Sequence, residues 1–216
     1  MLRPQPSATR DLAEVIFGYG LILVVLWTPD WLQRILSPLA LLATLAVLLA
    51  RRPSRDELGL GGRGLVPSLW ILPATIVLSA AGILMARRLG TLHPLSDRTL
   101  WHVVGYVLWT VYQQILLQDY FLTRLLRIFR SETASITMAA LLFAAAHLPN
   151  LVLTAATLVW GAVSCLLFHR YRNLYVLGLA QGLLGLCFAV CVPDALHHHM
   201  RVGLGYLHYQ AMHRIP

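Results

Sequence analysis

The sequence predicts an all-α membrane protein, a polytopic transmembrane bundle of seven or eight helices. Hydrophobic residues make up 58% of the 216 residues and charged residues only 12%, whereas soluble proteins average about 25% charged residues. The charges are clustered between long uncharged runs. These runs approach the roughly 20 apolar residues with which a helix crosses about 30 Å of hydrocarbon. A helix also satisfies its own backbone hydrogen bonds, as a bilayer requires.

Seven apolar segments are predicted to be helices, and we expect them to form one membrane domain over residues 1–216. They cover residues 12–28, 35–50, 66–86, 100–122, 134–148, 151–168 and 174–192. A weaker eighth segment, 195–212, contains three consecutive histidines. The sequence leaves open whether this last segment spans the membrane or lies along its surface, where an amphipathic helix is also stable.

Charges and prolines define where these segments end. Arginines separate the first four segments, at Arg34, at Arg51 and at Arg87. Pro149 separates the fifth segment from the sixth, because a proline cannot continue a helix without losing a hydrogen bond. A turn with two arginines, at 170–172, separates the sixth segment from the seventh.

The arginines also predict the orientation, since cytoplasmic loops carry an excess of basic residues. With the N-terminus in the cytoplasm, the outer loops hold only Arg34, Arg87, Arg88 and Arg98. The inner loops then hold Arg3, Arg10, Arg51, Arg52, Arg55, Arg63, Arg124, Arg127, Arg130, Arg170 and Arg172. We therefore attribute the net charge of +8 to topology. We expect no nucleic-acid partner, because no basic stripe with aromatic residues lies on a soluble domain.

Polar side chains inside the apolar segments are the candidate functional residues, because such residues are costly in a membrane unless they are paired or face a cavity. Segment 100–122 contains Gln113, Gln114, Gln118 and Asp119. Gln114 and Gln118 are four residues apart, so they would share one face of an α-helix. The alternative is a purely structural ladder of hydrogen bonds between helices.

Two further polar positions occur later in the chain. His147 ends segment 134–148, with Phe143 one turn earlier and Asn150 in the turn that follows. Gln181 is the strongly polar side chain of segment 174–192 and lies among glycines that allow close helix approach. Either position could be functional or serve packing alone. The three cysteines and the histidine run at 197–199 form no metal-ligand pattern, and we expect neither a metal nor another cofactor.

These motifs together resemble the CPBP family, the CAAX-protease and bacteriocin-processing intramembrane endopeptidases. That family has a Glu-Glu-x-x-x-Arg helix, then a Phe-x-x-x-His helix about 30 residues on, then a His-x-x-x-Asn/Asp helix after a similar interval. Here Gln113 and Gln114 stand where the family has its glutamates, and Gln118 stands at its arginine. The similarity covers residues 112–186.

The two later motifs follow at matching intervals. Phe143 and His147 agree with the family, whereas Gln181 stands at the second histidine and Gly185 at the final Asn or Asp. His147 lies 34 residues after Gln113 and 34 before Gln181. The resemblance implies an all-helical membrane protein with a pocket lined by these positions.

The resemblance also implies that a glutamate, together with the first histidine, activates water for attack on a peptide carbonyl. A glutamine amide cannot act as such a base. We therefore expect a homologue with weak or absent peptidase activity in a bacterial cytoplasmic membrane. It would bind a lipidated or transmembrane peptide, or a partner membrane protein.

Two alternatives remain open at this point. One is an active membrane protease with an atypical centre made of His147 and Asp119, although Asp119 could instead pair with Arg124 or Arg127. The other is a small membrane transporter or helper subunit that uses the polar pocket as a path.

Overall fold

The computed structural model describes residues 7–93 and 100–213, and these residues form helices joined by turns, with no strand among them. The all-α fold class is therefore confirmed. Arg3 and Arg98, which contribute to the predicted orientation, lie outside the described residues. The helices are α1 (Ala8–Leu26), α2 (Asp30–Ala50), α3 (Leu65–Ser68), α4 (Ile71–Leu89), α5 (Leu100–Gln114), η1 (Ile115–Leu122), α6 (Thr123–Phe129), α7 (Glu132–Ala145), α8 (Leu151–Tyr171), α9 (Leu174–Cys191), α10 (Asp194–His197), η2 (His198–Met200) and α11 (Gly203–His213).

Four helical stretches are long and apolar enough to cross a bilayer. They are α2, α8, α9 and the stretch Leu65–Leu89, which contains α3 and α4. Helix α1 has a similar length but carries Arg10, Asp11 and Glu14 near its beginning. Helix α7 is apolar but has only 14 residues. Together with the resemblance in the second half of the chain, these helices identify an integral membrane protein.

Two predicted segments are divided in the structure. The segment 66–86 becomes α3 and α4, which are separated by Leu69 and Trp70. The segment 100–122 begins as α5 and then continues as η1, a π-helix with i→i+5 hydrogen bonds.

The weak eighth segment, 195–212, is not one continuous helix. It is divided into α10, the 3₁₀-helix η2 and α11. Helix α11 has 11 residues, which span only about 16 Å at 1.5 Å per residue. This length is roughly half of the hydrocarbon thickness, so no single span covers the segment.

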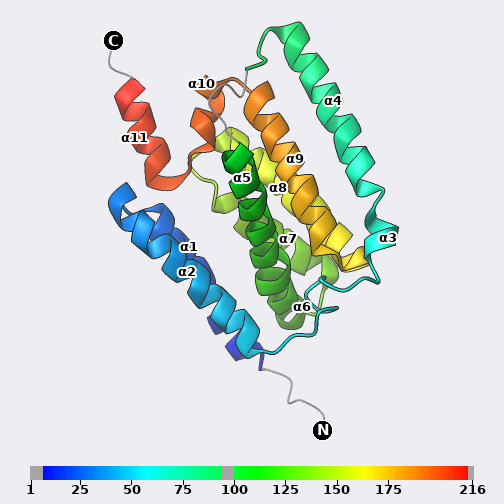
Figure 1. Ribbon diagram of the computed structural model, residues 1–216. Helices are drawn as coiled ribbons and strands as arrows, with labels where there is room; N and C mark the ends of the chain where they lie inside the picture. The colour runs from blue at the N-terminus through cyan, green and yellow to red at the C-terminus, as the bar shows by residue number, and fades with distance from the viewer. Residues whose placement is uncertain (1–6, 94–99, 214–216) are drawn as a thin grey trace. The chain divides into compact units, whose positions relative to one another are not determined.

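The chain forms two compact units, which we describe separately. Unit 1 comprises Met1–Pro53, Leu116–Cys165 and Val202–Pro216, and unit 2 comprises Ser54–Ile115 and Leu166–Arg201. In unit 1, α1 packs against α2 and α6, and α6 also packs against α7. In unit 2, α9 packs against both α4 and α5 (Figure 1).

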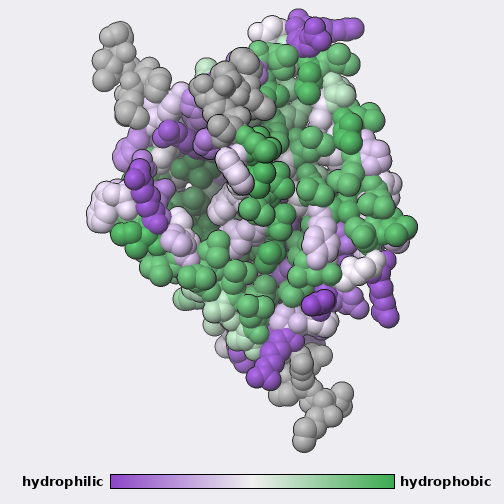
Figure 2. All heavy atoms as spheres, in the orientation of Figure 1, coloured by the Kyte–Doolittle hydropathy of each residue, from purple (hydrophilic) through white to green (hydrophobic). Residues whose placement is uncertain are grey.

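Apolar side chains are exposed on helices that a bilayer would cover. On α4, Ile76, Val77 and Leu78 are more than half exposed, as are Leu84 and Met85. Figure 2 shows this hydrophobic surface along α4, with hydrophilic side chains gathered at the end of the helix. Exposure of so much apolar area is expected for a surface in contact with lipid rather than with water.

Two glycines of α1 differ in their surroundings. A Cβ at Gly18 would collide with the ring of Tyr120, whereas a Cβ at Gly20 would meet no atom within 4 Å. Tyr120 is fully buried, and its hydroxyl donates a 2.8 Å hydrogen bond to the main-chain oxygen of Glu14. The absence of a side chain at Gly18 therefore allows η1 to pack against α1 within unit 1.

We predict that Gly18→Ala and Gly20→Ala change stability in opposite directions. At Gly18 the added methyl group would overpack the contact with Tyr120, at a cost of about 1–3 kcal/mol. At Gly20 the same change gains the helix propensity of alanine, up to about 1 kcal/mol. The measurement is the thermal unfolding midpoint in detergent, and equal effects at both positions would contradict the packing described here.

Candidate functional site

Three glutamines of unit 2 form a relay of hydrogen bonds between α5 and α9, which we call the amide relay. The side-chain nitrogen of Gln114 donates to the amide oxygen of Gln181 at 2.6 Å. The side-chain nitrogen of Gln181 donates in turn to the amide oxygen of Gln113, also at 2.6 Å. Gln114 is fully buried, and Gln181 is buried beside it. The structure thus brings together three of the predicted site residues.

Small residues let α5 and α9 approach closely enough for this relay. A Cβ at Gly178 would lie 3.2 Å from the Cα atom of Val111, and a Cβ at Gly182 would lie 3.2 Å from a methyl group of Val107. One turn before the relay, the hydroxyl of Thr110 donates to the main-chain oxygen of Gly178 at 3.0 Å. Close backbones and polar bonds of this kind are the usual contacts between membrane helices.

Gln118 lies in unit 1, within the π-helix η1, and has a different partner from Gln114. Its side-chain nitrogen donates to the hydroxyl of Ser164 on α8 at 3.2 Å, and Ser164 donates to the main-chain oxygen of Gly161. Gln118 is fully buried. The two glutamines therefore bond to different helices, Gln114 to α9 and Gln118 to α8.

His147 lies in unit 1, in the turn that follows α7. Its Nδ1 atom is 2.7 Å from the main-chain oxygen of Phe143, and the two rings meet edge to face at 5.0 Å. Because a carbonyl oxygen only accepts, Nδ1 carries the proton, and Nε2 of the neutral ring is left as an acceptor. His147 is half-buried. This tautomer suits a proton acceptor or a ligand-binding group.

Asn150 caps the beginning of α8. Its side-chain oxygen accepts the backbone N–H of Leu153 at 3.1 Å, at the beginning of α8. Asparagine is among the preferred residues for this role. The structure therefore gives Asn150 a structural function, and a role in chemistry stays a prediction.

Asp119 is buried in η1 of unit 1. The guanidinium of Arg124 contacts the main-chain oxygen of Asp119 at 3.3 Å. The carboxylates that Arg124 and Arg127 bind directly are those of Glu14 and Asp11, on α1. A catalytic role for Asp119 with His147 is not tested by these contacts.

Sequence analysis did not anticipate an ion-pair cluster in unit 1 that consists of Asp11, Glu14, Arg51, Arg124 and Arg127. Arg127 binds the Asp11 carboxylate through two nitrogens, each at 2.8 Å. Arg51 reaches Asp11 at 2.9 Å and Glu14 at 2.7 Å, and Arg124 reaches Glu14 at 2.7 Å. The signal was present in the sequence, because Asp11 and Glu14 are three residues apart on one helical face and both begin an apolar run.

The cluster joins α1 to α6 and to the end of α2. Asp11 is fully buried and Arg124 is almost so. Buried charges are tolerated only when they are paired and hydrogen-bonded, and removal of one partner is strongly destabilising. Burial by itself raises the pKa of the Asp11 carboxyl, but the hydrogen bond and charge of Arg127, with the charges of Arg51 and Arg124, lower that pKa below its ordinary value of 3.8.

Within residues 7–93 and 100–213, no three His, Cys, Asp or Glu side chains lie close enough together to hold a metal ion. The polar groups described above are amides, hydroxyls, one imidazole, the Asp119 carboxylate and the ion-pair cluster. The amide relay can donate and accept hydrogen bonds, but none of its members can take up a proton near neutral pH.

These features define an all-helical integral membrane protein with polar groups inside its apolar helices. Residues 94–187 match the family model described as type II CAAX prenyl endopeptidase Rce1-like. The matched segment contains the predicted core 112–186 and every motif position from Gln113 to Gly185. It confirms the resemblance to the CPBP family over these residues. Neither a curated protein nor a solved structure matches this sequence.

We predict a graded loss of stability when the amide relay is interrupted. Gln181→Leu removes both hydrogen bonds and Gln113→Leu removes one. Since each such bond between membrane helices contributes on average about 0.6 kcal/mol, Gln181→Leu should cost about 1–2 kcal/mol and Gln113→Leu about half as much. Unfolding of the purified variants in detergent measures both values. A smaller loss for Gln181→Leu than for Gln113→Leu would contradict the relay.

We also predict an acid-dependent loss of stability from the ion-pair cluster. Because the pKa of Asp11 is lowered in the folded state, its contribution is fully present above the ordinary value of 3.8 and is lost as the pH falls through the lowered pKa. Asp11→Asn should lower the unfolding midpoint at pH 7 and weaken its decline in acid.

The matched control for this experiment is Asp30→Asn, because Asp30 is an exposed carboxylate at the beginning of α2. This control should leave stability at pH 7 within about 0.5 kcal/mol of the wild type. Equal effects of the two substitutions would show that the ion-pair cluster does not contribute to stability.

Proposed function

We propose that this protein is a CAAX-protease-like homologue with weak or absent peptidase activity, which binds a peptide where related proteins cleave one. The observation that carries this proposal is the amide relay of Gln114, Gln181 and Gln113. In the family pattern these positions hold two glutamates and a histidine. Here the three positions hold neutral amides that bind one another.

The chemistry of the relay supports binding rather than hydrolysis. Activation of water requires a base that accepts its proton, and an amide does not provide one. The relay also contains no charge, so it needs no counter-ion within the apolar helices of unit 2. Its amides offer both donors and acceptors, which suit the backbone of an extended peptide.

The proposed ligand is a lipidated peptide, a transmembrane peptide or a segment of a partner membrane protein. The exposed apolar surface of α4 and the apolar composition of α8 and α9 support a site that is reached from within the bilayer. We further propose a bacterial cytoplasmic membrane, with the N-terminus in the cytoplasm. The distribution of arginines between the loops supports this orientation.

One observation favours a second candidate function, an active protease with an atypical centre. The Nδ1 atom of His147 donates to Phe143, so in the neutral ring Nε2 is the acceptor and has the character of a base. Asp119 is a buried carboxylate of the same unit. A centre of this kind would require His147 for turnover, which makes the two functions separable by experiment.

The test is a cleavage and binding assay on purified protein in proteoliposomes, with a fluorescent farnesylated peptide and a fluorescent transmembrane peptide. We expect no cleavage above background for the wild type or for His147→Ala, and we expect binding of at least one peptide. Gln181→Leu should weaken that binding by about fivefold, as expected for loss of roughly one hydrogen bond. Fluorescence anisotropy measures binding, and mass spectrometry measures cleavage.

The double variant Gln113→Glu/Gln114→Glu provides a further comparison, because it restores the two carboxyl groups of the family pattern. A gain of turnover in this variant would support the proposal that the amides are the reason for inactivity. Cleavage by the wild type that disappears in His147→Ala would instead establish the active protease.

A further inference from the structure

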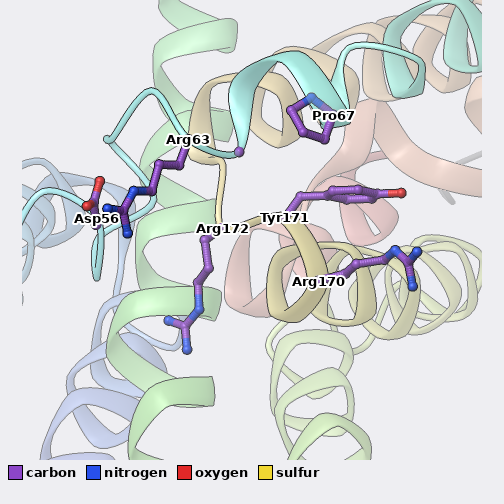
Figure 3. A pocket seen from close by; sticks show the side chains of 7 residues that line it. Asp56, Arg63, Pro67, Arg170, Tyr171 and Arg172 are labelled. Carbon is purple, nitrogen blue, oxygen red and sulfur yellow. The ribbon is translucent and has the colours of Figure 1, made fainter.

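A cavity of about 570 Å³ lies in unit 2, between the loop before α3 and the C-terminal end of α8. It is lined by Asp56, Arg63, Gly64, Pro67, Arg170, Tyr171 and Arg172. Figure 3 shows Arg63 on the loop before α3, directed toward Asp56, Arg170 in the last turn of α8, and Arg172 in the turn between α8 and α9. The three arginine side chains point in different directions. Three arginines and one aspartate give the lining an excess of positive charge, which the proposed peptide-binding function does not use.

The walls of this cavity are held by close backbone contacts. The N–H of Leu174 donates to the main-chain oxygen of Gly59 at 2.9 Å. A Cβ at Gly64 would collide with the main-chain oxygen of Tyr171, and a Cβ at Gly59 would come within 2.6 Å of the Phe168 ring. The loop before α3 therefore lies directly on the turn between α8 and α9, and the cavity is part of the folded unit.

Arg172 has a backbone conformation that disfavours arginine. Its φ angle is 49°, in the left-handed region where non-glycine residues are uncommon. Its guanidinium lies 5.1 Å from the Phe168 ring and donates one 3.4 Å hydrogen bond to the main-chain oxygen of Glu57. The backbone of Arg172 has the left-handed conformation with which helices commonly end, and Arg130 has it at the end of α6.

The cavity lies at the boundary between apolar helices and their polar loops. The candidate span α8 ends at Tyr171, the span α9 begins at Leu174, and the stretch Leu65–Leu89 includes Pro67. Trp70 is half exposed, and its indole N–H donates to the Tyr171 hydroxyl at 3.2 Å. Tryptophan and tyrosine are enriched at the level of lipid headgroups. The contact of Trp70 with Tyr171 therefore places the cavity at that level.

We propose that this cavity binds the phosphate of an anionic glycerophospholipid, with Arg63, Arg170 and Arg172 as its cationic side chains. Guanidinium groups match the oxygens of a phosphate in geometry and charge, and basic pockets beside membrane helices bind anionic headgroups. The acyl chains would lie along the exposed apolar surface of the neighbouring spans. In the proposed orientation this face meets the cytoplasmic leaflet. The proposal does not depend on peptidase activity.

The test uses native mass spectrometry of the full chain in a neutral detergent, with phosphatidylglycerol or phosphatidylcholine of the same acyl chains. We expect the wild type to retain phosphatidylglycerol at least fivefold better than phosphatidylcholine. Arg63→Gln/Arg170→Gln should reduce that binding by roughly tenfold, since each arginine near the headgroup contributes a few-fold. Arg87→Gln/Arg88→Gln removes the same charge from the other end of α4 and should leave phosphatidylglycerol binding unchanged.

Arg172→Gly gives a second, independent variant, because glycine accepts the left-handed conformation without strain. It should lower phosphatidylglycerol binding severalfold without lowering the unfolding midpoint, so the test stands even if the double variant does not fold. Equal retention of both lipids, or an equal loss in Arg87→Gln/Arg88→Gln, would overturn the proposal. Displacement of the lipid by an equimolar amount of inorganic phosphate would also overturn it and assign the cavity to free phosphate.

Discussion

Hydrocarbon supplies no hydrogen bonds, so a polar side chain among membrane helices needs a partner within the protein. In unit 2 this constraint joins α5 to α9 through Gln114, Gln181 and Gln113. The helices can approach because Gly178 and Gly182 carry no side chains. The close contact and the amide bonds thus support each other, and together they determine which positions of α5 face α9.

Unit 1 satisfies the same constraint with charges instead of amides. Asp11 and Glu14 are bound by arginines from two other parts of the chain, so α1 is held at its polar beginning. An isolated buried charge would be costly, but here Asp11 is paired with two arginines and Glu14 with three, the third being Arg10. Paired buried charge thus holds α1 in place in unit 1, whereas Gln113, Gln114 and Gln181 in unit 2 are neutral amides.

The fold class followed from the sequence because long uncharged runs have few solutions other than membrane helices. The resemblance placed Gln113, Gln114 and Gln181 in one pocket, and the structure brings these three side chains together, but the sequence did not predict the hydrogen bonds between them. A role of Gln118 in the site stays a prediction, and its partner Ser164 could not be predicted because a contact 46 residues away leaves no local pattern. The ion-pair cluster was missed because its arginines were interpreted as topology signals or as partners of Asp119. Pairing over a separation of more than 100 residues, as between Asp11 and Arg127, leaves no local pattern.

The π-helix η1 has a consequence for the history of this chain. An i→i+5 helix holds more residues per turn than an α-helix of the same length, so such a segment can absorb an inserted or deleted residue while the flanking helices stay in place. Residues before and after Ile115–Leu122 can therefore drift apart in register between relatives. Alignments of this segment with ordinary α-helical relatives should permit a gap there, and counting from Gln114 to Gln118 without one can equate positions that face different neighbours.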